Sequence, residues 1–96
     1  ALRWHPAGDQ PVPASRPDGN TFQVAFVNKR TTPVELIWMD REGQPKSYGL
    51  IAAGKVKRQQ TRPGAVWVIA TPGEEKPLGH FVVGDRAARA VVPPDQ

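Results

Sequence analysis

Few side chains in this 96-residue sequence could take part in chemistry. The two histidines, His5 and His80, lie near opposite ends of the sequence, and there is no cysteine. An enzyme needs a positioned acid, base, nucleophile or metal, and the sequence has none of the usual metal, nucleophile-elbow or phosphate-loop motifs. Predicted turns, where carboxylates are usually solvated, hold five of the nine carboxylates: Asp40, Glu42, Glu74, Glu75 and Asp85. We therefore predict a non-catalytic protein that needs no cofactor and no metal.

Aromatic residues carry more information than the titratable ones. The sequence has seven of them: Trp4, Phe22, Phe26, Trp38, Tyr48, Trp67 and Phe81. Tryptophan buries a large apolar area, so the simplest interpretation of Trp38 and Trp67 is that they fill the core. The alternative is that they form a binding surface.

The net charge of +4 raises the question of nucleic-acid binding. The basic residues are scattered, and the one cluster consists of Lys55, Lys57 and Arg58, with Arg62 nearby. Scattered cations attract phosphates in a salt-sensitive way without reading bases, so we expect no specific nucleic-acid binding. The longest nearly apolar run, residues 64–70, is far shorter than the ~20 residues of a membrane-spanning helix, and we expect no membrane insertion.

Alternation of apolar and polar residues begins after residue 20 and predicts strands. Seven short strands are predicted at residues 21–27, 34–39, 46–51, 55–61, 65–71, 78–83 and 87–92. One helical turn over residues 86–90 is an alternative for the last of them. Strands at this spacing, with turn signals between them, predict an all-β fold, a two-sheet antiparallel β-sandwich.

Residues 1–20 have a different composition from the rest of the chain. They hold four of the eleven prolines and little apolar periodicity. Proline removes backbone donors and fixes φ. We therefore predict a flexible proline-rich arm over residues 1–20, held at most by packing of Trp4, followed by one domain over residues 21–94.

Several of these motifs resemble the von Hippel-Lindau (VHL) β-domain family. The resemblance covers about residues 20–94, and its specific part is the spacing Asn28…Trp38…Tyr48…Gly54…Trp67. The segments that carry it are Phe26-Val27-Asn28-Lys29-Arg30, residues 34–38, Asp40–Gly43, Pro45, Tyr48, Gly54, Lys57-Arg58, Arg62, Gly64 and Trp67.

The resemblance implies a sandwich of about seven strands that captures an extended peptide and recognises a hydroxylated proline. Its pocket combines two tryptophans, a tyrosine, a serine and a histidine. By position, Trp38, Tyr48 and Trp67 match the aromatic residues, and Thr61 matches the serine. Ala65 stands in place of the histidine, and Gln60 replaces a further histidine nearby. Recognition of a hydroxyl needs polar partners in the pocket; Thr61 supplies one and Ala65 none, so the resemblance implies proline recognition without a strict demand for hydroxyproline.

We therefore expect a non-catalytic module that binds a proline-containing peptide or protein through Trp38, Tyr48, Thr61 and Trp67. The alternative is a structural or accessory domain of a larger exported protein or enzyme, with no ligand of its own. Carbohydrate or nucleic-acid contact through Trp38, Trp67 and residues 55–58 is a third interpretation. The family's helical domain has no counterpart, so no ubiquitin-ligase adaptor is expected. Abundant alanine, arginine, valine and proline suggest a bacterial source. The working hypothesis is an exported or periplasmic location, or a place within a larger bacterial protein.

Overall fold

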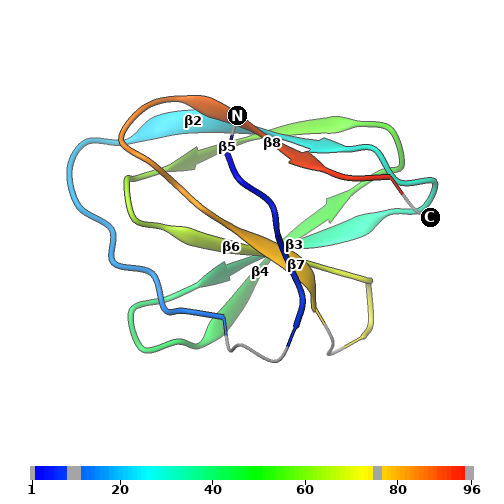
Figure 1. Ribbon diagram of the computed structural model, residues 1–96, viewed down its shortest axis with the longest axis horizontal. Coiled ribbons are helices and arrows are strands. Elements are labelled where there is room, and N and C mark those ends of the chain that lie inside the picture. Colours follow the sequence, from blue (N-terminus) through cyan, green and yellow to red (C-terminus); the bar gives the residue numbers. More distant parts are fainter. Residues whose placement is uncertain (1, 9–11, 75–76, 95–96) are drawn as a thin grey trace.

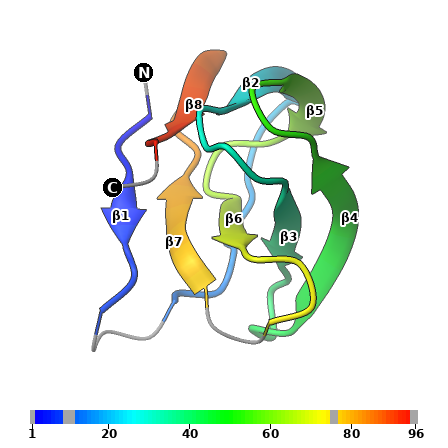
Figure 2. The ribbon, with the colours of Figure 1, turned by 90° about the vertical axis from the view of Figure 1, so that its right-hand side faces the viewer.

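Alternating apolar residues build two sheets that face each other (Figure 1). The computed structural model describes residues 2–8, 12–74 and 77–94. One sheet has five strands in the order β1-β7-β6-β3-β4, which lie side by side in Figure 2. They are β1 (His5–Pro6), β7 (Pro77–Val82), β6 (Val66–Ala70), β3 (Val34–Met39) and β4 (Pro45–Ile51). The other sheet has three strands in the order β5-β2-β8, formed by β5 (Val56–Thr61), β2 (Phe22–Asn28) and β8 (Ala88–Val92).

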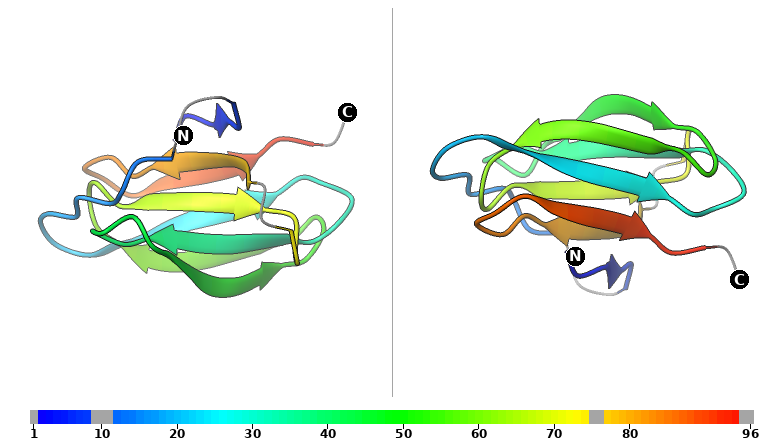
Figure 3. Two further views of the ribbon diagram at one scale, coloured as in Figure 1. Left: turned by 90° about the horizontal axis from the view of Figure 1, so that it is seen from below. Right: turned by 90° about the horizontal axis from the view of Figure 1, so that it is seen from above.

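The predicted sandwich is confirmed, and each of the seven predicted strands is present. The segment from Ala88 to Val92 is a strand and not a helical turn. The pairing differs from the prediction in one place, because β2 and β8 run parallel. β7 and β8 follow each other in the chain but belong to different sheets (Figure 3). The chain therefore crosses between the layers before β8, and such a crossover allows parallel pairing.

The core lies between the sheets and consists of the inward residues of each strand. Phe26 on β2 and Phe81 on β7 are fully buried, and their ring centroids lie 6.1 Å apart. The Trp67 ring on β6 meets Phe26 edge-on at 5.6 Å. Since Phe26 belongs to the three-stranded sheet and the other two rings to the five-stranded sheet, this aromatic cluster holds the layers together.

An eighth strand, β1, comes from the segment predicted to be a flexible arm. Its two residues pair with β7, with His5 opposite His80. The centroid of the Trp4 ring lies 5.1 Å from that of Phe81. Apart from these strands, the described part of the chain contains no helix long and apolar enough to cross a membrane. A strand of two residues is too short to show any periodicity, so the sequence pattern contained no signal for β1.

The second part of the predicted arm also contacts the sandwich. Ser15 is 1% exposed, and its Oγ accepts a 2.7 Å hydrogen bond from the Val66 amide. The Arg16 amide donates to the Gly64 carbonyl at 3.0 Å, and the Asp18 amide donates to the Pro63 carbonyl at 2.9 Å. Residues that pack against the sandwich are therefore already present before residue 21. The flexibility of residues 1–20 stays a prediction.

Candidate functional site

A row of aromatic side chains crosses the inner face of the five-stranded sheet. Trp67 on β6 lies opposite Phe81 on β7 and opposite Trp38 on β3, and Trp38 lies opposite Lys46 on β4. Residues directly opposite each other share one face of a sheet. Along the row burial falls, from Phe81 (0% exposed) and Trp67 (2%) through half-buried Trp38 to exposed Lys46. The row therefore runs from the core to the surface at the β4 edge.

Tyr48 belongs to an irregular part of β4. Opposite β4, the register shifts between Glu35 and Ile37, and such bulges change the direction of a side chain. The Tyr48 ring stands edge-on to Trp67 with centroids 5.1 Å apart, yet Tyr48 is 43% exposed. Tyr48 thus covers the outer side of a buried tryptophan while remaining accessible to a ligand.

Thr61 approaches the same tryptophan from the three-stranded sheet. It is the last residue of β5 and is only 6% exposed. Its Oγ1 accepts a 3.0 Å hydrogen bond from Trp67 Nε1. A hydroxyl that accepts this bond still has its own hydrogen to donate. Thr61 therefore fixes the indole and presents a polar group beside it.

These side chains line one cavity of about 430 Å³ at the end of the sandwich where β3 and β5 end and β2 and β6 begin. The structure brings together all four predicted site residues there, Trp38, Tyr48, Thr61 and Trp67. Ala65, 2% exposed, also lies in the wall. The cavity is large enough for a small ligand or one peptide side chain, since ligand pockets of proteins are about 300–1,000 Å³.

Sequence reasoning did not assign four further lining residues to the site: Pro17, Thr21, Gln59 and Arg62. A signal existed for Gln59, because it lies two positions before Thr61 and shares its inward face opposite the buried Val24. Pro17 was missed because it belongs to the segment predicted to be a flexible arm. Gln60, which was considered, lies at the rim and donates a 2.9 Å hydrogen bond to Thr21 Oγ1.

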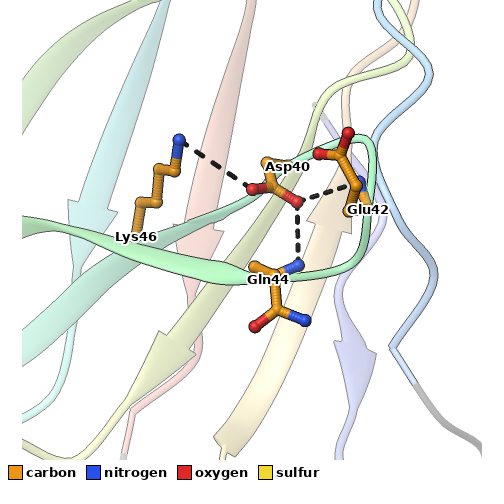
Figure 4. A network of polar contacts seen from close by, with 4 residues as sticks. All are labelled: Asp40, Glu42, Gln44 and Lys46. Atoms are coloured by element: carbon orange, nitrogen blue, oxygen red, sulfur yellow. Dashed lines mark hydrogen bonds and ion pairs between the residues drawn. The ribbon is translucent and has the colours of Figure 1, made fainter.

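Asp40 corrects the expectation that turn carboxylates are merely solvated. It is 8% exposed, and its Oδ1 accepts hydrogen bonds from the amides of Glu42 (2.9 Å) and Gln44 (2.8 Å). Lys46 Nζ lies 3.9 Å from Oδ2, as Figure 4 shows. The same lysine lies 5.7 Å from the centre of the Trp38 ring. Asp40 therefore closes the β3–β4 turn and positions a cation beside the cavity.

Two members of the predicted basic cluster, Lys57 and Arg58, lie on opposite faces of β5. Lys57 lies opposite the buried Phe26, whereas Arg58 lies opposite Ala25 on the outer side. Lys57 Nζ donates a hydrogen bond to the Tyr48 carbonyl. Lys57 consequently connects β5 to β4 next to the cavity and is separated from Arg58.

The cavity presents both apolar and polar groups. It joins aromatic walls to hydroxyl and amide groups from Thr21, Thr61, Gln59 and Gln60. Within residues 2–8, 12–74 and 77–94, no group of three or more histidine, cysteine or acidic side chains is placed to hold a metal ion. Aromatic surfaces with a few convergent polar groups are typical of sites that fix the orientation of a ligand.

Comparison with known protein families gives one match. The family model described as VHL beta domain matches residues 14–81, which is more than half of the chain and includes every residue that lines the cavity. The match starts at residue 14, one position before the buried Ser15. No curated protein matches the chain.

Proposed function

The chain belongs to the VHL β-domain family, a family of non-catalytic peptide-binding modules, and on this premise we propose that its aromatic cavity binds a proline ring of an extended peptide or protein segment. The proline ring would lie against Trp67 and Trp38, with Tyr48 at the entrance. Proline-containing segments have restricted, extended backbones, so aromatic grooves bind them at low entropic cost. This proposal explains why Tyr48, a large aromatic residue, stays exposed beside a cavity.

Two edge strands support binding of an extended ligand. β4 is the last strand of the five-stranded sheet and β5 is the first of the three-stranded sheet. Both contribute lining residues, Tyr48 from β4 and Gln59 and Thr61 from β5. An edge strand offers backbone donors and acceptors to an added segment. A peptide can therefore pair its main chain at the cavity entrance while its ring enters.

The walls of the cavity favour recognition of the ring over recognition of a hydroxyl group on it. The Thr61 hydroxyl provides one polar partner, whereas Ala65 contributes only a methyl group. Discrimination in favour of a hydroxylated ligand is large only where buried polar groups are left unpaired by the ligand that lacks the hydroxyl. We expect proline and 4-hydroxyproline peptides to bind with affinities within about threefold of each other, and Ala65→His to increase the preference for hydroxyproline.

The observation that carries the proposal is the position of Tyr48, 43% exposed and edge-on to the buried Trp67 at the mouth of a cavity of about 430 Å³. An open cavity beside an exposed aromatic ring is expected of a domain that binds a ligand, and is not expected of an accessory domain without one.

The test is a titration of the labelled protein with three short peptides that differ only at one central position, proline, 4-hydroxyproline or alanine. The indole N–H signals of Trp38 and Trp67 should shift with the first two peptides and not with the third. Tyr48→Ala should weaken proline-peptide binding at least tenfold. Its matched control is Leu50→Ala, because Leu50 is 57% exposed on the same strand and does not line the cavity. Absence of any shift at several millimolar peptide, where Kd corresponds to about −4 kcal/mol, would favour the accessory-domain interpretation.

A further inference from the structure

A second hollow lies beside the aromatic cavity and shares one wall with it. This hollow has a volume of about 370 Å³ and is lined by Ala14, Ser15, Arg16, Pro17 and Arg41. Pro17 also lines the aromatic cavity. We call the second site the arginine hollow. The two sites are therefore neighbours that share Pro17.

Hydrogen bonds hold the segment that forms the arginine hollow. Buried Ser15 holds one end of the segment through Val66, and the Arg16 amide is bonded to Gly64. Arg41 donates a 3.1 Å hydrogen bond from Nη2 to the Pro17 carbonyl. A guanidinium has five N–H donors in a planar fork, so Arg41 retains donors for a ligand after making this bond.

The charged side chains that line the hollow are two arginines. Arg16 and Arg41 are both exposed at the hollow, and Arg62 lines the neighbouring cavity. The carboxylates of the same loops are Asp18, Asp40 and Glu42. Of these, Asp40 is committed to two turn amides and to Lys46. The remaining two, Asp18 and Glu42, do not line the hollow.

We propose that the arginine hollow binds an acidic side chain of the same ligand whose proline ring enters the aromatic cavity. The partner of this domain is then an extended segment with an aspartate or glutamate close to its proline. This inference rests on the proposed function and adds a second site to it. An extended chain rises about 3.3 Å per residue, so an acidic residue about two to four positions from the proline can reach over Pro17. Arg41 and Arg16 form charge-assisted hydrogen bonds to its carboxylate.

The test compares three peptides with the same central proline and with acidic, neutral or basic flanking residues. At low salt, the acidic peptide should bind about twofold to tenfold more tightly than the neutral one, because each exposed ion pair contributes modestly. The basic peptide should bind most weakly. Raising the ionic strength to about 0.5 M should remove most of the difference, since screening shortens the reach of these charges.

Substitutions show which side chains cause the preference for the acidic peptide. Arg16→Gln should reduce the advantage of the acidic peptide while leaving the affinity for the neutral peptide unchanged. Arg41→Gln should also reduce this advantage, and its effect is measured as the ratio of the two affinities, because Arg41 also bonds the carbonyl of Pro17 in the cavity wall. Arg41→Lys keeps the charge and serves as a second variant, which should retain part of the advantage. The matched control is Arg89→Gln, which removes the same charge from an exposed position on β8, at the far edge of the three-stranded sheet from β5.

The outcomes separate the two proposals. If all three peptides bind with equal affinity, the arginine hollow has no role and the proposed function stands. An advantage of the acidic peptide that Arg89→Gln lowers as much as Arg41→Gln would also overturn the inference, because it would reflect net charge alone. If none of the peptides binds, both proposals are wrong.

Discussion

At Gly64 the backbone of the N-terminal segment passes close to the sandwich. Its φ is 84°, a left-handed conformation that alanine adopts at a cost of about 1–2 kcal/mol. A Cβ at this position would lie 2.2 Å from the Arg16 carbonyl oxygen and 2.9 Å from its carbon. These are backbone atoms, so the segment that contains Arg16 must move if residue 64 gains a side chain.

The cost of Gly64→Ala can be compared with that of Gly54→Ala. Gly54 has a similar φ of 71°, but among the described residues no atom lies within 4 Å of its added Cβ. Gly54→Ala therefore carries only the conformational cost. Gly64→Ala also weakens the hydrogen bonds from Arg16 to Gly64 and from Asp18 to Pro63, each worth about 0.5–1.5 kcal/mol. We expect Gly64→Ala to destabilise the protein by about 1–3 kcal/mol more than Gly54→Ala.

Urea unfolding followed by circular dichroism measures this difference. For a domain of this size, 1 kcal/mol corresponds to about 4–8 °C in Tm, so thermal unfolding should also separate the variants. Because Pro17 lines the cavity, Gly64→Ala should weaken binding of the proline peptide as well, whereas Gly54→Ala should not. Equal losses of stability in the two variants would show that the contact between Arg16 and Gly64 contributes nothing, and would favour a flexible arm over residues 1–20.

Three further changes test two hydrogen bonds near the site and the pH dependence of stability. Thr61→Val keeps the shape of the side chain but leaves Trp67 Nε1, which donates to Thr61, without its acceptor. We expect the free energy of unfolding in urea to fall by about 1–3 kcal/mol and the indole N–H signal to shift, and an unchanged stability would contradict this. Ser15→Ala removes the acceptor of the Val66 amide and should cost about 1–3 kcal/mol, whereas a loss below about 0.5 kcal/mol would mean that water replaces the hydroxyl. Burial and the neighbouring His5 lower the pKa of His80 below its ordinary 6.5. The unfolded chain therefore protonates this histidine more readily than the folded chain does, and the free energy of unfolding should fall as the pH drops below about 6.5. His80→Gln should reduce this dependence of stability on pH, and a stability that rises towards pH 5 would refute the argument.

The strands could be predicted from the sequence because a period of two is a local property. Val24 and Phe26 are buried and Gln23 is exposed, which is the pattern that half-buried strands require. The parallel pairing of β2 with β8 could not be predicted in this way, because it depends on which layer the chain enters after β7. Similarly, β1 depends on long-range contacts, since it pairs with the edge of β7 and the neighbouring Trp4 packs on Phe81.

The site shows the same division between local and long-range information. The spacing of Trp38, Tyr48 and Trp67 identified the aromatic walls through a family resemblance, and the register that places Trp38 opposite Trp67 explains why they meet. Pro17 and Arg41 carry no local signal of this kind. Pro17 reaches the site because Ser15 and Gly64 hold the N-terminal segment against the sandwich, a contact between residues far apart in sequence. Arg41 lies in the β3–β4 turn and meets Pro17 through the same long-range packing.

The central claim is that a proline ring enters the cavity between Trp38, Tyr48 and Trp67. Intermolecular nuclear Overhauser effects between a bound peptide and the labelled protein test it directly. The ring protons of proline should give contacts to the aromatic protons of Tyr48 and Trp67, and these contacts should be lost in Tyr48→Ala. Contacts from the proline ring to residues outside the cavity, with none to Trp67, would contradict the claim.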